Sequence, residues 1–146
     1  QAVLEASRVT ILPSTPSTFE HLRSYDDVDV ALDPWPYHGT TTTCEAFLMG
    51  VPVISLVGDR HAARVGLSLS SAVGLSELAV DSPESFVAAA RRLASSEDLL
   101  MRWRQELRER LLSGPLGDFA KYANRVGEAL RTAWREACGR DATRKN

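Results

Sequence analysis

Residues 28–50 read VDVALDPWPYHGTTTTCEAFLMG. The apolar, β-branched run at residues 28–32 predicts a strand that ends at a proline-rich turn. Four threonines then open a stretch that predicts a short helix, with Gly50 at its end. The first N–H groups of a helix lack acceptors, and the helix dipole favours negative charge there. The segment therefore predicts either a phosphate or pyrophosphate site, or a helix start with an ordinary threonine cap.

The sequence on both sides predicts alternating strands and helices. Three of each are expected, in the order 8–12, 18–25, 28–32, 42–49, 51–57 and 62–73. Ser17 and Glu20 have the spacing of a capping box at the first helix. This alternation is typical of a parallel sheet wound with helices, whose ligands bind beyond the carboxyl ends of the strands. The loops at 33–41 and 58–61 both follow strands at that edge.

The rest of the chain predicts three helices. Ser82 is expected to cap the first, with Pro83 at its first position, and Ser96 is expected to cap the second. Trp103 and Trp134 occur at helical spacing and are expected in the core. The last helix has apolar residues three and four apart, as one buried face requires: Phe119, Tyr122, Val126, Leu130, Ala133 and Ala137.

The predicted class is α/β, a partial doubly wound parallel sheet followed by C-terminal helices. The chain has 146 residues, of which 44% are hydrophobic and 25% charged, as in a single globular domain. We expect one lobe over residues 1–138, incomplete at its N-terminus, and a polar tail over 139–146. Cys44 and Cys138 lack metal-ligand spacing and are typical of reduced thiols in a cytoplasmic protein.

The charge is unevenly distributed along the chain. Residues 1–90 hold four arginines against eleven carboxylates, whereas residues 91–146 hold thirteen basic and eight acidic residues. The basic half is either a surface for nucleic acid or anionic lipid, or the solvated faces of helices. The interspersed acidic residues favour solvated faces. We therefore expect no nucleic-acid partner, and the short apolar runs predict no membrane span.

Four segments of the sequence together resemble a known family. Residues 29–34, 39–46, 49–53 and 58–66 resemble the C-terminal region of O-linked N-acetylglucosamine transferases. They look most like the bacterial members, which usually carry tetratricopeptide repeats upstream. The similarity extends from about Arg8 to the last helix. It implies a two-lobed glycosyltransferase in which this chain is the later part of the lobe that binds UDP-N-acetylglucosamine.

The resemblance also implies a set of UDP-binding residues: His21, Gly39, Thr40, Thr41, Thr42 and Glu45. Thr41 and Thr42 would meet the pyrophosphate, Glu45 the ribose hydroxyls, and His21 the uracil ring. The family's general-base candidates, and a lysine that neutralises the leaving diphosphate, lie upstream of this segment. The resemblance therefore implies no catalytic residue in this chain, and no metal ion or cofactor besides the donor substrate.

Three positions depart from the family pattern. Thr18 and Ser24 stand where the better-known eukaryotic members have a lysine and an arginine, and Glu45 replaces an aspartate. These departures leave the selectivity for the nucleotide base open.

The expected function is transfer of N-acetylglucosamine from UDP to serine or threonine hydroxyls of a protein, which the upstream region would bind. Two alternatives remain. One is a nucleotide-sugar enzyme with another acceptor or with epimerase activity, and the other is a non-catalytic interaction domain. His38 is expected to serve the turn rather than a ligand, and Cys44 to be a small buried residue rather than a nucleophile. Arg60 and His61 either approach the donor or belong to an exposed loop.

Overall fold

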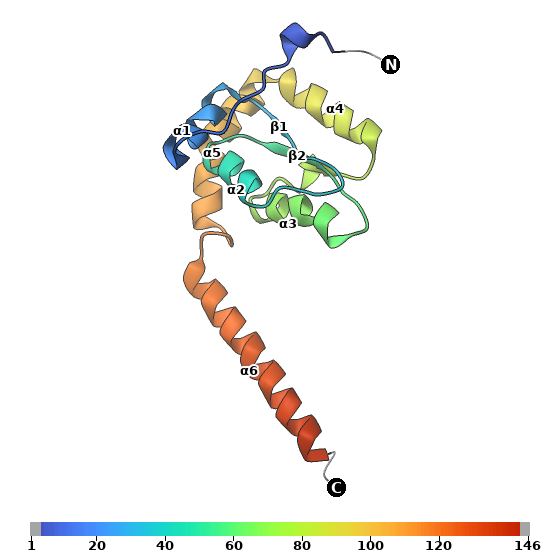
Figure 1. Cartoon of the computed structure of the whole chain (residues 1–146), viewed down its shortest axis with the longest axis vertical. Helices are drawn as coiled ribbons and strands as arrows, with labels where there is room; N and C mark the ends of the chain where they lie inside the picture. The colour runs from blue at the N-terminus through green and yellow to red at the C-terminus, as the bar shows by residue number, and fades with distance from the viewer. Residues whose placement is uncertain (1–3, 144–146) are drawn as a thin grey trace.

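The computed structural model describes residues 4–143, with side chains up to residue 139. The helices are α1 Thr18–Arg23, α2 Thr41–Leu48, α3 Val65–Ala72, α4 Pro83–Ala94, α5 Glu97–Ser113 and α6 Phe119–Thr143 (Figure 1). The strands are β1 Ala31–Leu32, β2 Val53–Leu56 and β3 Ala79–Val80. Single 3₁₀ turns form at Ala6–Arg8, Ser24–Asp27, His61–Ala63 and Ser76–Leu78.

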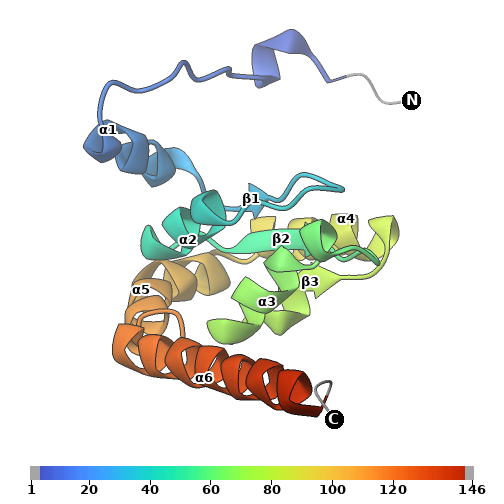
Figure 2. The ribbon, with the colours of Figure 1, turned by 60° about the horizontal axis from the view of Figure 1, so that its bottom comes forward.

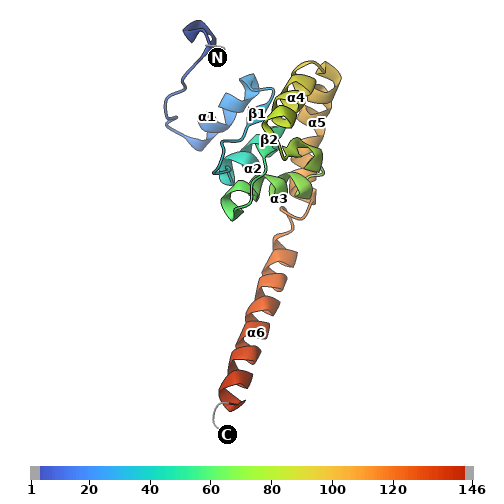
Figure 3. The same cartoon turned by 90° about the vertical axis from the view of Figure 1, so that its right-hand side faces the viewer.

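The three strands form one parallel sheet in the order β1-β2-β3. Ala31 lies opposite Val53, and Ser55 lies opposite Ala79. The sheet lies between α4 on one side and α2 and α3 on the other (Figures 1 and 3). Helices on both faces make the central strand almost wholly buried, as its apolar sequence indicates. The predicted α/β class, with a parallel sheet and C-terminal helices, is confirmed.

The strand predicted at residues 8–12 is wrong. Ala6–Arg8 form a 3₁₀ turn, and the residues that follow are extended but paired with no strand. Figure 2 shows this N-terminal segment on the β1 side of the body, apart from the sheet. Ile11 is 88% exposed and Leu12 is 64% exposed. A β-rich sequence forms a strand only where a neighbouring edge offers it hydrogen bonds and a face to pack on.

Other element bounds differ because pairing limits them. Only Ala31–Leu32 of the strand predicted at 28–32 is paired, and only Val53–Leu56 of that at 51–57. The helix predicted over 62–73 begins at Val65, after the 3₁₀ turn at His61–Ala63. Strand β3 is absent from the sequence-based prediction, because two paired residues carry no periodicity.

The sequence predicts serine caps for three helices. Ser17 Oγ accepts from Glu20 N at 3.2 Å, which confirms the predicted cap of α1. Ser82 Oγ accepts from Ser85 N at the start of α4. Ser96 is the N-cap residue of α5, as predicted, but its side chain makes no capping hydrogen bond.

The core lies between the sheet, α2, α4 and α5. Its buried cluster includes Phe47, Val51, Ile54, Leu75, Leu78, Leu93, Trp103, Leu107 and Leu111.

The prediction that the last helix buries one face against the lobe is wrong for this chain. α6 projects away from the body (Figures 1 and 3). Its apolar side chains are exposed, including Trp134 at 71%. The helix also continues through the start of the predicted tail, whose residues 144–146 lie outside the described part. Within residues 4–143, no helix is both long and apolar enough to cross a bilayer.

Candidate functional site

The first turn of α2 presents exposed threonines at the edge beyond the sheet. Thr41 and Thr42 are exposed, and the side chain of Thr40, at the N-cap, makes no capping bond. Thr43 is buried, and its Oγ1 donates to the Gly39 carbonyl at 3.0 Å. Helix geometry leaves the first backbone N–H groups without intrahelical acceptors. The Thr41 and Thr42 hydroxyls therefore lie beside amide groups that can bind an anion.

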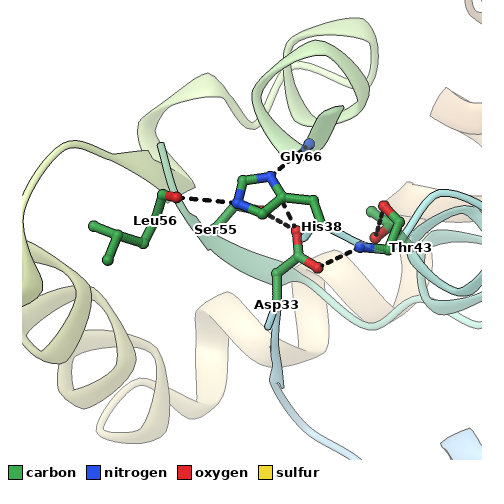
Figure 4. Close-up of polar contacts among 7 residues, drawn as sticks. Asp33, His38, Thr43, Ser55, Leu56 and Gly66 are labelled. Atoms are coloured by element: carbon green, nitrogen blue, oxygen red, sulfur yellow. Dashed lines mark hydrogen bonds and ion pairs between the residues drawn. The ribbon is translucent and has the colours of Figure 1, made fainter. Parts of the chain in front are cut away.

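A buried carboxylate holds the loop that leads into α2. Asp33 follows β1 and is only 6% exposed. Its Oδ1 accepts from Gly39 N at 2.8 Å, and its Oδ2 accepts from Ser55 Oγ at 2.9 Å (Figure 4). Ser55 belongs to the central strand β2. Asp33 thus ties the turn before α2 to the sheet, through hydrogen bonds that a charged acceptor strengthens.

His38 ties the same loop to α3. Its Nδ1 accepts from the backbone N–H of Gly66 at 3.0 Å, so Nε2 carries the proton of the neutral ring and donates to the Leu56 carbonyl at 3.0 Å (Figure 4). The carboxylate of Asp33 lies 3.5 Å from Nδ1. At residue 66 only glycine fits, because a Cβ would lie 2.8 Å from Asp33 Oδ2.

The structure confirms that His38 serves the turn and shows that its role extends further. The side chain is 1% exposed and links β2, α3 and the loop before α2. The sequence offers one signal for this role. Asp33 and His38 flank a proline-rich loop directly after a buried strand, where paired polar groups are expected to brace the backbone. Spacing alone does not show that Gly66 and Leu56 come to meet the ring.

A second group of polar residues lies one turn further along α2. His21 Nε2 lies 3.0 Å from Glu45 Oε2, with the two side chains 41% and 23% exposed. The Tyr25 hydroxyl donates to the Thr42 carbonyl at 3.3 Å, and its ring meets the His21 ring edge-on. The pair His21–Glu45 therefore joins α1 to α2 and leaves both side chains within reach of solvent.

One cavity lies along α3, beside Thr40 at the start of α2. Its volume is about 530 Å³, and its lining residues are Thr40, His61, Arg64, Val65, Leu67, Ser68 and Leu69. The residues around it include two basic side chains and no carboxylate. Arg60 instead lines a separate cavity of about 490 Å³, together with Trp35 and Tyr37. Arg60 and His61 thus line different cavities, although they are neighbours in one loop.

Comparison with known proteins places this geometry in a family. Residues 1–126 match glycosyl transferase family 41. The chain belongs to glycosyl transferase family 41. Its relatives include the probable UDP-N-acetylglucosamine–peptide N-acetylglucosaminyltransferase SPINDLY of Solanum lycopersicum, which is 40% identical over 97% of this chain. The corresponding enzyme of Caenorhabditis elegans is 27% identical over 90% of it.

A solved structure of an O-GlcNAc transferase shows the same fold. A mutant O-GlcNAc transferase of Thermobaculum terrenum superposes with a TM-score of 0.80 and 39% identity, over 87% of this chain and 24% of that one. The family 41 chain described here spans only 15% of the length of the tomato relative. These comparisons confirm the predicted resemblance to O-GlcNAc transferases at the level of the family.

The structure gathers the predicted UDP-binding residues of this family 41 chain around α2. Gly39 and Thr40 immediately precede the helix, and Thr41 and Thr42 form its first turn. Glu45 follows one turn later and brings in His21 from α1. Two groups therefore form, one at the end of the helix and one along its side. Tyr25 connects the two groups, because its hydroxyl donates to the Thr42 carbonyl and its ring meets the ring of His21.

The cysteine next to Glu45 offers a test of the local environment. Burial raises the pKa of the Cys44 thiol, and the negative charge of Glu45 raises it further. A thiol reacts as its thiolate, so we expect iodoacetamide at about pH 8 to modify the exposed Cys138 well before the half-buried Cys44. Peptide mass spectrometry over time measures both rates in one sample.

The substitution Glu45→Gln is the control for this prediction. It removes the negative charge beside Cys44, so the modification of Cys44 should become faster while that of Cys138 keeps its rate. Equal rates for the two thiols of the parent chain would contradict the environment described for Cys44.

Proposed function

We propose that this chain is the donor-binding portion of a glycosyltransferase that moves N-acetylglucosamine from UDP to serine or threonine hydroxyls of proteins. The observation that carries the proposal is the arrangement of two polar groups along one helix. The threonine-rich N-terminal end of α2 is followed, one turn later, by the Glu45 carboxylate held against His21. A nucleoside diphosphate has the same order of parts, because its ribose and base follow its phosphates.

Each group then has a distinct role in the proposal. The N–H groups and hydroxyls at Thr41 and Thr42 bind the diphosphate and stabilise the charge that develops as UDP departs. Glu45 accepts hydrogen bonds from the ribose hydroxyls, and His21 lies beside the base. Asp33 and His38 touch no substrate in this scheme but fix the loop that carries these groups.

The cavity beside Thr40 adds positive charge to the same site. Arg64 donates one of its N–H groups to the Gly58 carbonyl at 3.1 Å, which leaves other donors for a ligand. A departing diphosphate carries more negative charge than a helix end of about half a unit charge can balance. We propose that Arg64 contributes to that balance and that His61 can donate a hydrogen bond, whereas Arg60 in the neighbouring cavity does neither.

Ligand binding tests the site assignment. Thr41→Ala and Thr42→Ala should weaken UDP and inorganic pyrophosphate alike, each by about 0.5–1.5 kcal/mol, because each removes one hydroxyl bond to phosphate. Glu45→Ala should weaken UDP and leave pyrophosphate unchanged, because it contacts only the nucleoside. Isothermal titration calorimetry on folded variants measures both ligands.

Thr132→Ala is the matched control, because Thr132 is an exposed helical threonine on α6, remote from α2. It should bind both ligands as the parent chain does. If all three site variants also bind UDP like the parent, the assignment is wrong. If the parent chain binds no UDP, the donor-binding function itself is contradicted, and the alternative of an interaction domain is favoured.

The finer features of the proposal concern the whole protein. We propose that it resembles the bacterial members that carry tetratricopeptide repeats, that these repeats bind the protein acceptor, and that the enzyme acts in the cytoplasm. We also propose that the donor site needs no metal ion or cofactor, since helix N–H groups and basic side chains surround the proposed phosphate position. The complete upstream sequence tests the repeats, and transfer assays with and without a chelator test the metal.

A further inference from the structure

Arg104 of α5 holds three backbone carbonyls from two separate parts of the chain. Its Nη1 donates to the carbonyls of Met49 at 2.9 Å and Tyr25 at 3.2 Å, and its Nη2 donates to the Val28 carbonyl at 2.7 Å. Tyr25 and Val28 bracket the connection from α1 to β1, whereas Met49 is the C-cap of α2. One guanidinium therefore fixes the α1 segment and α2 relative to each other.

The contact with α2 is built into the backbone as well. Met49 supplies one of the last carbonyls of α2, which lack donors from within the helix and attract a cation. The next residue, Gly50, has a φ of 77°. A Cβ there would lie 2.7 Å from the carbonyl oxygen of Arg104. The C-terminal end of α2 thus rests directly on α5, while its N-terminal end faces the proposed ligand.

Tyr25 links this clamp to the candidate site. Its backbone carbonyl is held by Arg104, and its hydroxyl donates to the carbonyl of Thr42 in the first turn of α2. Its ring centroid lies 5.7 Å from that of His21, at an interplanar angle of 87°. The position of His21 against Glu45 therefore depends on where the Tyr25 segment is held.

We propose that Arg104 is a positioning residue that keeps His21 on α1 in register with Glu45 on α2. A planar guanidinium presents its donors in a fixed fork, so the three carbonyls are held in one geometry. Without the fork, the polar contacts of this segment with α2 are the 3.3 Å bond of Tyr25 and the His21–Glu45 contact, beside the packing of Tyr25 and Val28 on the core. The nucleotide role of the pair rests on the proposed function, but its geometry does not.

The first experiment uses the chain of residues 1–146 without any ligand. In the parent chain, Glu45→Gln should shift the NMR signals of the His21 imidazole. These signals are assigned as the ones that disappear in His21→Gln. In Arg104→Met this response should be lost, because the two side chains no longer meet. Arg102→Met is the matched control, since Arg102 lies on the same helix, where its guanidinium bonds to Glu106 and lies against the Trp103 ring. It should leave the response intact.

The second experiment measures binding. Arg104→Met should weaken UDP by about tenfold, the loss expected for one misplaced hydrogen bond, and should change pyrophosphate affinity by less than about twofold. A merely destabilising substitution would affect both ligands together. If the parent chain binds no UDP, the proposed function fails, while the NMR experiment still decides the role of Arg104.

Arg104→Lys covers the case in which Arg104→Met does not fold. Lysine keeps the positive charge but replaces the fork by one nitrogen. Its His21 response to Glu45→Gln should be reduced, and Arg104→Met should reduce it further where that variant folds. If Arg104→Met folds and its His21 signals respond to Glu45→Gln as those of the parent do, the proposal is overturned. If Arg104→Met does not fold, the same result for Arg104→Lys overturns it.

Discussion

Replacing Trp103 by alanine should lower the free energy of unfolding by about 3–5 kcal/mol, the range for removing a large aromatic side chain from a core. Trp103 is only 7% exposed and packs in the cluster that contains Leu107 and Leu111. The guanidinium groups of Arg102 and Arg110 lie 5.2 and 5.0 Å from the centre of its ring. Urea unfolding followed by circular dichroism measures the change without relying on tryptophan fluorescence.

Trp134 provides the comparison within the same chain. It is 71% exposed on α6, so Trp134→Ala should change the free energy of unfolding by no more than about 0.5 kcal/mol. The two variants lose the same atoms and differ only in burial. A loss above about 2 kcal/mol for Trp134→Ala would show that α6 packs against the lobe in solution, as the sequence pattern suggests.

Replacing Asp33 by alanine should cost about 3 kcal/mol of unfolding free energy, because it leaves two donors without their charged acceptor. Ser55 is fully buried, and the Gly39 N–H lies at the turn before α2. The variant should also weaken pyrophosphate binding, since that turn sets the position of the exposed threonines. Chemical denaturation and calorimetry on the same preparation measure both effects.

Asp33→Asn is the control with nearly the same shape. Its amide oxygen can still accept from the Gly39 N–H, while its NH₂ group can donate to Ser55 Oγ, whose own hydroxyl proton then loses its acceptor. The expected loss is therefore smaller than that of Asp33→Ala. If Asp33→Ala is as stable as the parent chain, the buried carboxylate does not hold the loop.

Local sequence determined those parts of the fold whose cause lies within a few residues. Ser17 and Ser82 cap their helices because a hydroxyl reaches an amide three positions on. Gly50 ends α2 because only glycine adopts its positive φ without strain. The threonine-rich start of α2 is likewise a local feature, so the candidate anion site could be predicted from the sequence. Only the resemblance to the family predicted that His21 and Glu45 serve one ligand, because their spacing along the chain does not bring α1 against α2.

Only the tertiary structure decided which groups are buried and which elements pair. His38 is a buried link because Gly66 and the Leu56 carbonyl, distant in the sequence, come to its two ring nitrogens. Residues 9–12 form no strand, and β3 forms from two residues, because strand formation depends on a neighbouring edge. The spacing of apolar residues along α6 produces an apolar face on that helix. Burial of this face also needs a surface that packs against it, and no part of the described lobe covers it.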